Sequence, residues 1–207
     1  FNISTKLFSP ITIYGNVNQT DQKIDLLANI PYIAQKKKLI ENTFLAVDID
    51  KSLHKCQLLV HSELPTKRGI MPIDIICNGI DNRLDTYANW KIDCKERFEG
   101  AVDISTLFTR NYDNKFITTI DVNPSQLVFN DSIWDIQQSH IEYADKSFIV
   151  ENLDIRHADQ FINITGKASP SPNDSLCLSL SNVNLDYIFQ TLKIKQVNIG
   201  GDATGTF

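Results

Sequence analysis

The sequence lacks the short motifs that commonly mark an enzyme. It has no Gly-x-Ser-x-Gly nucleophile turn, no His-Glu-x-x-His zinc motif, no phosphate-binding loop and no glycine-rich dinucleotide turn. Its four histidines are isolated from one another. His157 and Asp159 come nearest to a polar pair, and at that spacing on a turn they are more typical of local hydrogen bonding. We therefore expect no enzymatic activity, no catalytic residues and no cofactor.

Metal binding and a membrane span are also unsupported. The four cysteines, Cys56, Cys77, Cys94 and Cys177, show no Cys-x-x-Cys spacing and no nearby histidine pair, which argues against a zinc site. We expect buried free thiols, with one disulfide as the alternative. No window approaches the ~20 consecutive apolar residues of a membrane helix, and no signal-peptide pattern opens the chain.

Positive charge is scarce and scattered. Twenty lysines and arginines face 25 aspartates and glutamates, a formal net charge of -5. Nucleic-acid surfaces need clustered cations, so we expect no nucleic-acid partner. The only basic run, Lys36-Lys37-Lys38, is typical of a solvated turn. The chain starts at Phe1 without methionine and ends in a strand-like stretch, and we expect it to be a piece of a longer protein.

Alternation of apolar and polar residues is abundant. It is clearest from Asp131 to Leu180, where short alternating runs are separated by turn residues such as Asp145-Lys146. Lys23–Ile30 and Leu39–Asp50 repeat the pattern. Such spacing predicts an all-β chain in which strands joined by tight turns form an antiparallel meander.

One segment departs from this period. Leu185, Ile188, Phe189 and Leu192 recur at helical spacing, and Asn184 is placed to cap them, so we expect one short helix near 185–192. A weak echo between residues 21–26 and 159–164 suggests a repeated module. We divide the chain into β modules at 1–64, 65–130 and 131–207, parts of one continuous β structure rather than separate domains.

A single sheet with one apolar face must cover that face with a second layer, by curling, or with a ligand. Acyl chains suit such a trough because each buried methylene contributes about 0.8 kcal/mol without a directional partner. An ordinary sandwich core is the alternative for the same side chains. Our candidate groove-lining residues are Ile24, Leu26, Leu45, Val47, Leu58, Val60, Ile162, Ile164, Leu176, Leu178 and Leu180.

The later half of the chain carries a family likeness. Trp134-x-Ile136, Phe148-x-Val150-x-Asn152-Leu153-x-Ile155, Ile162-x-Ile164-x-Gly166 and Leu176-x-Leu178-x-Leu180 follow one another in order. This series resembles a repeat in the C-terminal region of the TamB family, the translocation and assembly module proteins, which are AsmA-like. Gly15 with Asp21–Leu26 and Ile30-Pro31 looks similar to another module of those proteins.

The resemblance implies a periplasmic segment of the Gram-negative cell envelope, with an inner-membrane anchor elsewhere in the protein. It implies an elongated, curved half-pipe whose apolar concave face carries phospholipid acyl chains to the outer membrane, a lipid-transport role in outer-membrane biogenesis. An alternative role for the family is assembly or secretion of outer-membrane barrels and autotransporters with an Omp85-type partner.

Two further alternatives stay open. A carbohydrate-binding β-sandwich would need aromatic rings, such as those of Trp90, Tyr112 and Trp134, clustered and exposed on one side. Unpaired strand edges at the two ends of the sheet could also let the isolated fragment form an edge-strand dimer.

Overall fold

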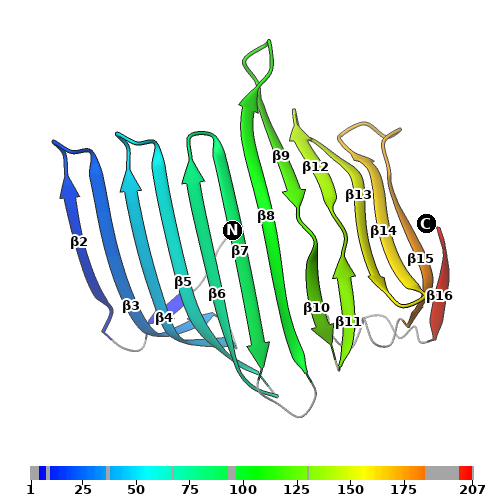
Figure 1. Cartoon of the computed structure of the whole chain (residues 1–207), viewed down its shortest axis with the longest axis horizontal. Helices are drawn as coiled ribbons and strands as arrows, with labels where there is room; N and C mark the ends of the chain where they lie inside the picture. The colour runs from blue at the N-terminus through cyan, green and yellow to red at the C-terminus, as the bar shows by residue number, and fades with distance from the viewer. Residues whose placement is uncertain are drawn as a thin grey trace.

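The computed structural model describes residues 5–7, 10–35, 38–66, 68–92, 97–129, 131–184 and 201–206. All regular structure in these segments is β, and sixteen strands form one antiparallel sheet (Figure 1). The all-β prediction is confirmed. The helix predicted at 185–192 lies outside the described residues. In chain order the strands are β1 (Thr5–Leu7), β2 (Thr12–Asn18), β3 (Lys23–Gln35), β4 (Lys38–Asp50), β5 (Lys55–Thr66), β6 (Gly69–Ile80), β7 (Arg83–Ile92), β8 (Phe98–Arg110), β9 (Phe116–Val122), β10 (Ser125–Phe129), β11 (Ser132–Ile136), β12 (Ser139–Ala144), β13 (Ser147–His157), β14 (Gln160–Ala168), β15 (Leu176–Asn184) and β16 (Asp202–Thr206).

The sheet is a meander, because strands follow one another across it in chain order (Figure 1). Some positions are filled by two half-strands. The C-terminal half of β8 pairs with β9, whereas its N-terminal half pairs with β10. Asn123 and Pro124 lie between β9 and β10, and proline has no amide hydrogen to donate to a neighbouring strand. The Asp103 amide instead donates to Ser125 Oγ at 3.1 Å, and the Asn123 amide to the Asp103 carbonyl at 2.9 Å.

Tight turns join the strands where the sequence predicts them. Asp145 and Lys146, between β12 and β13, both have positive φ, at 47° and 64°. That pair of conformations twists in the same sense as the flanking strands, so a two-residue loop suffices. Ala158, between β13 and β14, also has positive φ, at 50°.

The sheet curls toward its apolar side. Trp134 on β11 and Val183 on β15 belong to one buried cluster with Leu180, although β13 and β14 separate the two strands. Side chains of such distant strands can meet on one face only if that face is concave. The predicted half-pipe with an apolar concave face is therefore confirmed.

The convex face carries cross-strand polar pairs. Lys23 Nζ lies 3.0 Å from Asp50, His61 Nδ1 2.6 Å from Asp74, and His140 Nδ1 2.6 Å from Asp121. An apolar stripe crosses the same face between these pairs: Tyr14, Leu27, Ala46, Leu59, Ile76 and Tyr87 follow one another in register.

Hydrogen-bonded pairing continues across both predicted module boundaries. The first boundary, between residues 64 and 65, lies inside β5, and the second falls in the sequence between the paired strands β10, which ends at Phe129, and β11, which begins at Ser132. The division into modules at these points stays a prediction.

Candidate binding groove

One row of side chains crosses almost the whole concave face. Register pairing links each member to the next across neighbouring strands, from β2 to β15. The row, which we call the transverse row, is Val17, Ile24, Ile49, Cys56, Gly79, Leu84, Thr106, Ile120, Ile141, Val150, Gly166 and Leu176. Directly paired residues share a face of the sheet. No member carries a charge, and Thr106 is the one member with a polar side-chain group other than the Cys56 thiol, so the floor is largely apolar.

The groove is open at its N-terminal end and filled at its C-terminal end. Val17 and Ile24 are 66% and 37% exposed. Trp134 and Leu180, by contrast, are 6% and 9% exposed, and Val183 is fully buried in the same cluster. The space available to a ligand is therefore concentrated over the first half of the sheet.

The structure places all eleven sequence-predicted lining residues on the concave face. Six of them lie on β3, β4 and β5, and the other five on β14 and β15. Leu180 is buried in the Trp134 cluster, and Ile162 and Leu178 pack against that cluster. These three side chains therefore pack within the protein, whereas Leu176 at the other end of β15 is 45% exposed.

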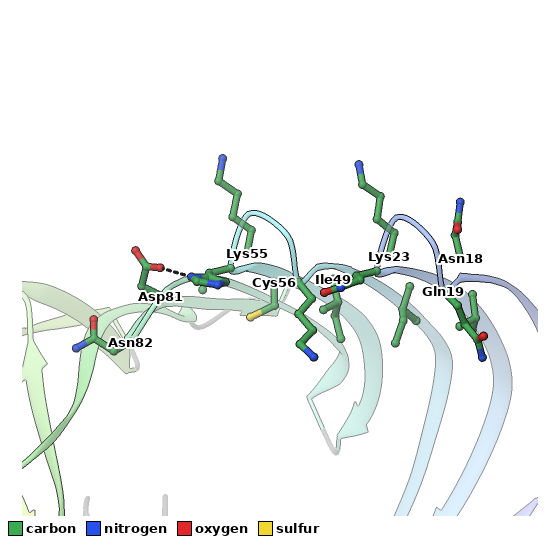
Figure 2. Close-up of a pocket in the computed structure, with 14 residues that line it drawn as sticks. Asn18, Gln19, Lys23, Ile49, Lys55, Cys56, Asp81 and Asn82 are labelled. Atoms are coloured by element: carbon green, nitrogen blue, oxygen red, sulfur yellow. Dashed lines mark hydrogen bonds and ion pairs between the residues drawn. The ribbon is translucent and has the colours of Figure 1, made fainter.

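A pocket of about 800 Å³ opens at one end of the groove, where the β2–β3, β4–β5 and β6–β7 hairpins lie side by side (Figure 2). Its floor is apolar and belongs to the transverse row: Val17, Ile24, Ile49, Cys56 and Gly79. Its rim is polar: Asn18, Gln19, Gln22, Lys23, Lys51, His54, Lys55, Asp81 and Asn82. The pocket therefore joins an apolar trough to a polar edge.

Gly79 makes room in this floor. A Cβ at Gly79 would lie 2.3 Å from Cys56 Sγ and 3.6 Å from Leu84 Cδ1. The Cys56 side chain therefore occupies the space that a larger residue at position 79 would need. Gly100 does the same for Trp90, whose ring carbon Cζ2 would lie 2.4 Å from an added Cβ.

Two carboxylates near the pocket are already paired. Asp50 accepts hydrogen bonds from Ser52 Oγ at 2.6 Å and from the Leu53 amide at 3.1 Å, and it pairs with Lys23 at 3.0 Å. The hydrogen bonds from Ser52 and Lys23 lower the pKa of Asp50 to about 2. Asp81 Oδ1 lies 3.0 Å from His54 Nδ1.

Two lysines of the pocket take no part in the pairs that Asp50 and Asp81 form. Among the described residues, Lys51 and Lys55 have no carboxylate within ion-pair distance. In Figure 2, Lys23 and Lys55 point away from the side on which Ile49 and Cys56 lie. By formal charge the pocket lining carries three lysines against one aspartate, and Asp50 offsets Lys23.

Sequence reasoning missed the pocket itself. The alternation of Leu45, Val47 and Ile49 places Ile49 on the same face as the predicted lining, so that residue could have been found. Lys51 and Gln19 lie in turns, where periodicity predicts no facing. Cys56 is exposed rather than buried, so the expectation of buried thiols is wrong for it; Cys56, Cys77 and Cys177 are free.

The three aromatic residues considered for glycan binding do not form one exposed cluster. Trp90 and Trp134 lie on the concave face, linked in register through Gly100 and Leu127, and Trp134 is buried. Tyr112 is fully exposed at the tip of the β8–β9 hairpin, which projects beyond the other turns (Figure 1).

The described residues contain no group of three or more histidine, cysteine, aspartate or glutamate side chains arranged to hold a metal. The same residues include no helix with the length and hydrophobicity to cross a membrane. Compared with models of protein families, with curated proteins and with solved structures, the chain has no significant match. The resemblance to the TamB family therefore stays a hypothesis.

Proposed function

We propose that this chain is a non-enzymatic segment of a lipid conduit, and that its concave face holds the acyl chains of phospholipids. The observation that carries the proposal is the transverse row. It offers an uncharged floor across the sheet, and no second layer of described residues covers its N-terminal half. From the TamB resemblance we further propose that the segment lies in the periplasm of a Gram-negative bacterium, between an inner-membrane anchor and the outer membrane.

The dimensions of the row fit an extended apolar ligand. Neighbouring strands lie about 4.8 Å apart, so a row that passes from β2 to β15 spans roughly 50 Å. Each methylene buried on it contributes about 0.8 kcal/mol. Because acyl chains need no directional partner, they can slide along such a floor, which is what transfer requires.

The polar groups favour a binding role over catalysis. His61 and His140 each pair with one aspartate on a neighbouring strand, and His54 pairs with Asp81 of a neighbouring turn. A hydrolytic or transfer site would place a nucleophile and its base together beside a substrate cavity. The pairs His61–Asp74 and His140–Asp121 lie on the convex face, away from the groove. They support the sheet through cross-strand contacts.

Site-specific photo-crosslinking tests the proposal. A photoreactive amino acid at Leu58, on the concave face, should capture phospholipid in cells that carry the full-length protein. The same amino acid at neighbouring Gln57, on the convex face, is the matched control and should capture far less. Equal capture at both positions, or none at Leu58 while the protein remains functional, would contradict the proposal.

A specific observation favours one other function, strand addition to a client barrel. β2 pairs only with β3, so its other edge has no partner among the described residues. Its sequence, Thr12–Asn18, contains no proline and no charged residue, the usual protections of an exposed edge.

The two functions respond to different substitutions. Under strand addition, proline at Ile13 or Tyr14 should abolish assembly of the client barrel, because one of these two adjacent amides points outward. Leu58→Asp in the groove should leave assembly intact. Under the lipid proposal, Leu58→Asp should abolish phospholipid capture, whereas proline at Ile13 or Tyr14 should leave that capture intact. Phospholipid capture and client-barrel accumulation are measured in the same cells.

A further inference from the structure

The pocket at the end of the groove combines two chemical environments that an amphiphile needs. Its floor is the start of the transverse row, and its rim is formed by three hairpin turns. Figure 2 shows Gln19 pointing to the same side as Ile49 and Cys56, so an amide borders the apolar floor there. A ligand with an apolar tail and a polar head would place each part against matching groups.

The rim selects the sign of that head group. Three lysines line the pocket, Lys23, Lys51 and Lys55, against one aspartate, Asp81. Asp50 neutralises Lys23, and Asp81 lies against His54. Lys51 lines the pocket directly, whereas the Lys55 ammonium points away from the floor and adds its charge from across the rim.

We propose that this pocket holds the anionic head group of a phospholipid whose acyl chains lie on the transverse row. The inference rests on the proposed lipid-binding function and deepens it, because it names the charge of the lipid and the residues that recognise it. Lys51 is the principal contact, and the phosphate of an anionic head group would supply the carboxylate-like partner that Lys51 lacks. A zwitterionic head group would bring its own cation toward the same lysines and gain less.

Cys56 provides a built-in reporter of occupancy. It is an exposed free thiol in the pocket floor, whereas Cys177 lies at a position whose neighbours Leu176 and Leu178 face the groove, so its side chain faces the other way. Alkylation by iodoacetamide, followed at each cysteine by peptide mass spectrometry, therefore reports the pocket and a reference site in one sample.

The probes are lysophosphatidylglycerol, which is anionic, and lysophosphatidylcholine, which is zwitterionic, with identical acyl chains and below their micelle-forming concentrations. For the full chain we expect lysophosphatidylglycerol to halve the Cys56 alkylation rate at a concentration about two- to fivefold lower than lysophosphatidylcholine, the range for one partly exposed ion pair. The Cys177 rate should not change.

Charge reversal at the pocket should remove the preference. In Lys51→Glu, the two lipids should halve the Cys56 alkylation rate at the same concentration. Each rate is normalised to the lipid-free rate of the same variant. Lys146→Glu, in the β12–β13 turn of the same edge, changes net charge equally and should retain the preference. Lys51→Gln repeats the test without a new negative charge, and circular dichroism checks that each variant keeps its sheet.

The outcomes separate the two proposals. Equal protection by both lipids, or a preference that survives Lys51→Glu, overturns the head-group site and leaves the acyl-chain groove standing. Protection by glycerol 3-phosphate alone, without an acyl chain, also overturns it, because the site would then bind free phosphate. If neither lipid binds and Leu58 captures no phospholipid, the proposed function itself is overturned.

Discussion

At the scale of single residues, Trp134 is the largest side chain of the buried cluster at the C-terminal end of the sheet. It is 6% exposed and packs in the cluster with Leu180 and Val183, and its ring centroid lies 5.3 Å from that of His157. Its Nε1–H is nevertheless buried without an acceptor among the residues that the structure describes. A buried donor left unpaired costs about 1–3 kcal/mol, so the ring contributes through volume and not through its polar atom.

Replacing Trp134 therefore separates these two effects. Trp134→Phe removes the unpaired donor and leaves a small void, and we expect the free energy of unfolding to change by less than about 1.5 kcal/mol. Trp134→Ala should lower it by about 3–5 kcal/mol. Urea unfolding followed by circular dichroism measures both values. If phenylalanine cost as much as alanine, the indole N–H would have to be making an important hydrogen bond.

Asp50 makes the fold sensitive to acid. Its pKa of about 2 lies below the ordinary value of 3.8, chiefly because Ser52 and Lys23 hydrogen-bond to the carboxylate. A lowered folded-state pKa stabilises the protein above pH 3.8, and that contribution is lost as the pH falls toward 2. Asp50→Asn should therefore be less stable than the parent at pH 7 and lose less stability between pH 4 and pH 2.

Urea unfolding at each pH measures the difference. Asp48→Asn is the matched control, because Asp48 lies on the same strand and face, and no hydrogen bond or ion pair of its side chain occurs among the described residues. Parallel loss of stability by Asp50→Asn and its parent across this pH range would show that Asp50 does not carry the effect.

At the scale of elements, β2 decides how the sheet ends. Ile13, Tyr14 and Val17 are 61%, 70% and 66% exposed, and within the described ranges the strand has a hydrogen-bonded neighbour on one side only. An uncharged edge of this kind can pair with the same edge of a second copy. If the chain associates, we expect it to do so by strand pairing at β2.

A charge on that edge should oppose pairing. We expect the parent chain to self-associate with rising concentration, and Val17→Lys to shift the equilibrium toward monomer by at least about tenfold, since lysine on an edge strand is a common protection. Analytical ultracentrifugation measures the dissociation constant. Val17→Thr, which keeps β propensity without charge, should associate like the parent. A parent chain that stays monomeric throughout would contradict the prediction.

At the scale of the whole molecule, the sheet behaves as a line of neighbours. Among the described residues each strand has its main contacts with the strands hydrogen-bonded to it, and the cluster of Trp134, Leu180 and Val183 brings together strands that are not adjacent in the sheet. In such quasi-one-dimensional structures, stability is a sum of local terms and nearest-neighbour interfaces. Local opening of one part need not involve the other.

Hydrogen exchange tests this locality. Leu58→Ala, in the N-terminal half, should cost about 2 kcal/mol and lower amide protection in β4, β5 and β6. Protection in β13, β14 and β15 should stay as in the parent. Mass spectrometry of exchanged peptides resolves the two regions. Uniform loss of protection along the chain would mean that the sheet opens as one cooperative unit.

The amino-acid sequence alone determined the strands, their facing and several of their turns. Leu45, Val47 and Ile49 alternate with polar neighbours, and Asp145-Lys146 can adopt positive φ, so both features follow from local geometry. The suggested resemblance to the TamB family also rests on these local patterns, and it stays a hypothesis.

Tertiary structure decided what the concave face contains. Curvature accumulates from the twist between many strands, so no single segment encodes that Leu180 meets Trp134 and closes one end of the groove. The lateral alignment of three separate hairpins likewise brings Lys51 beside the floor that Cys56 and Gly79 form. The apolar face could be predicted residue by residue from the sequence. The open pocket with its lysine-bearing rim exists only because three separate turns lie along one edge of the sheet.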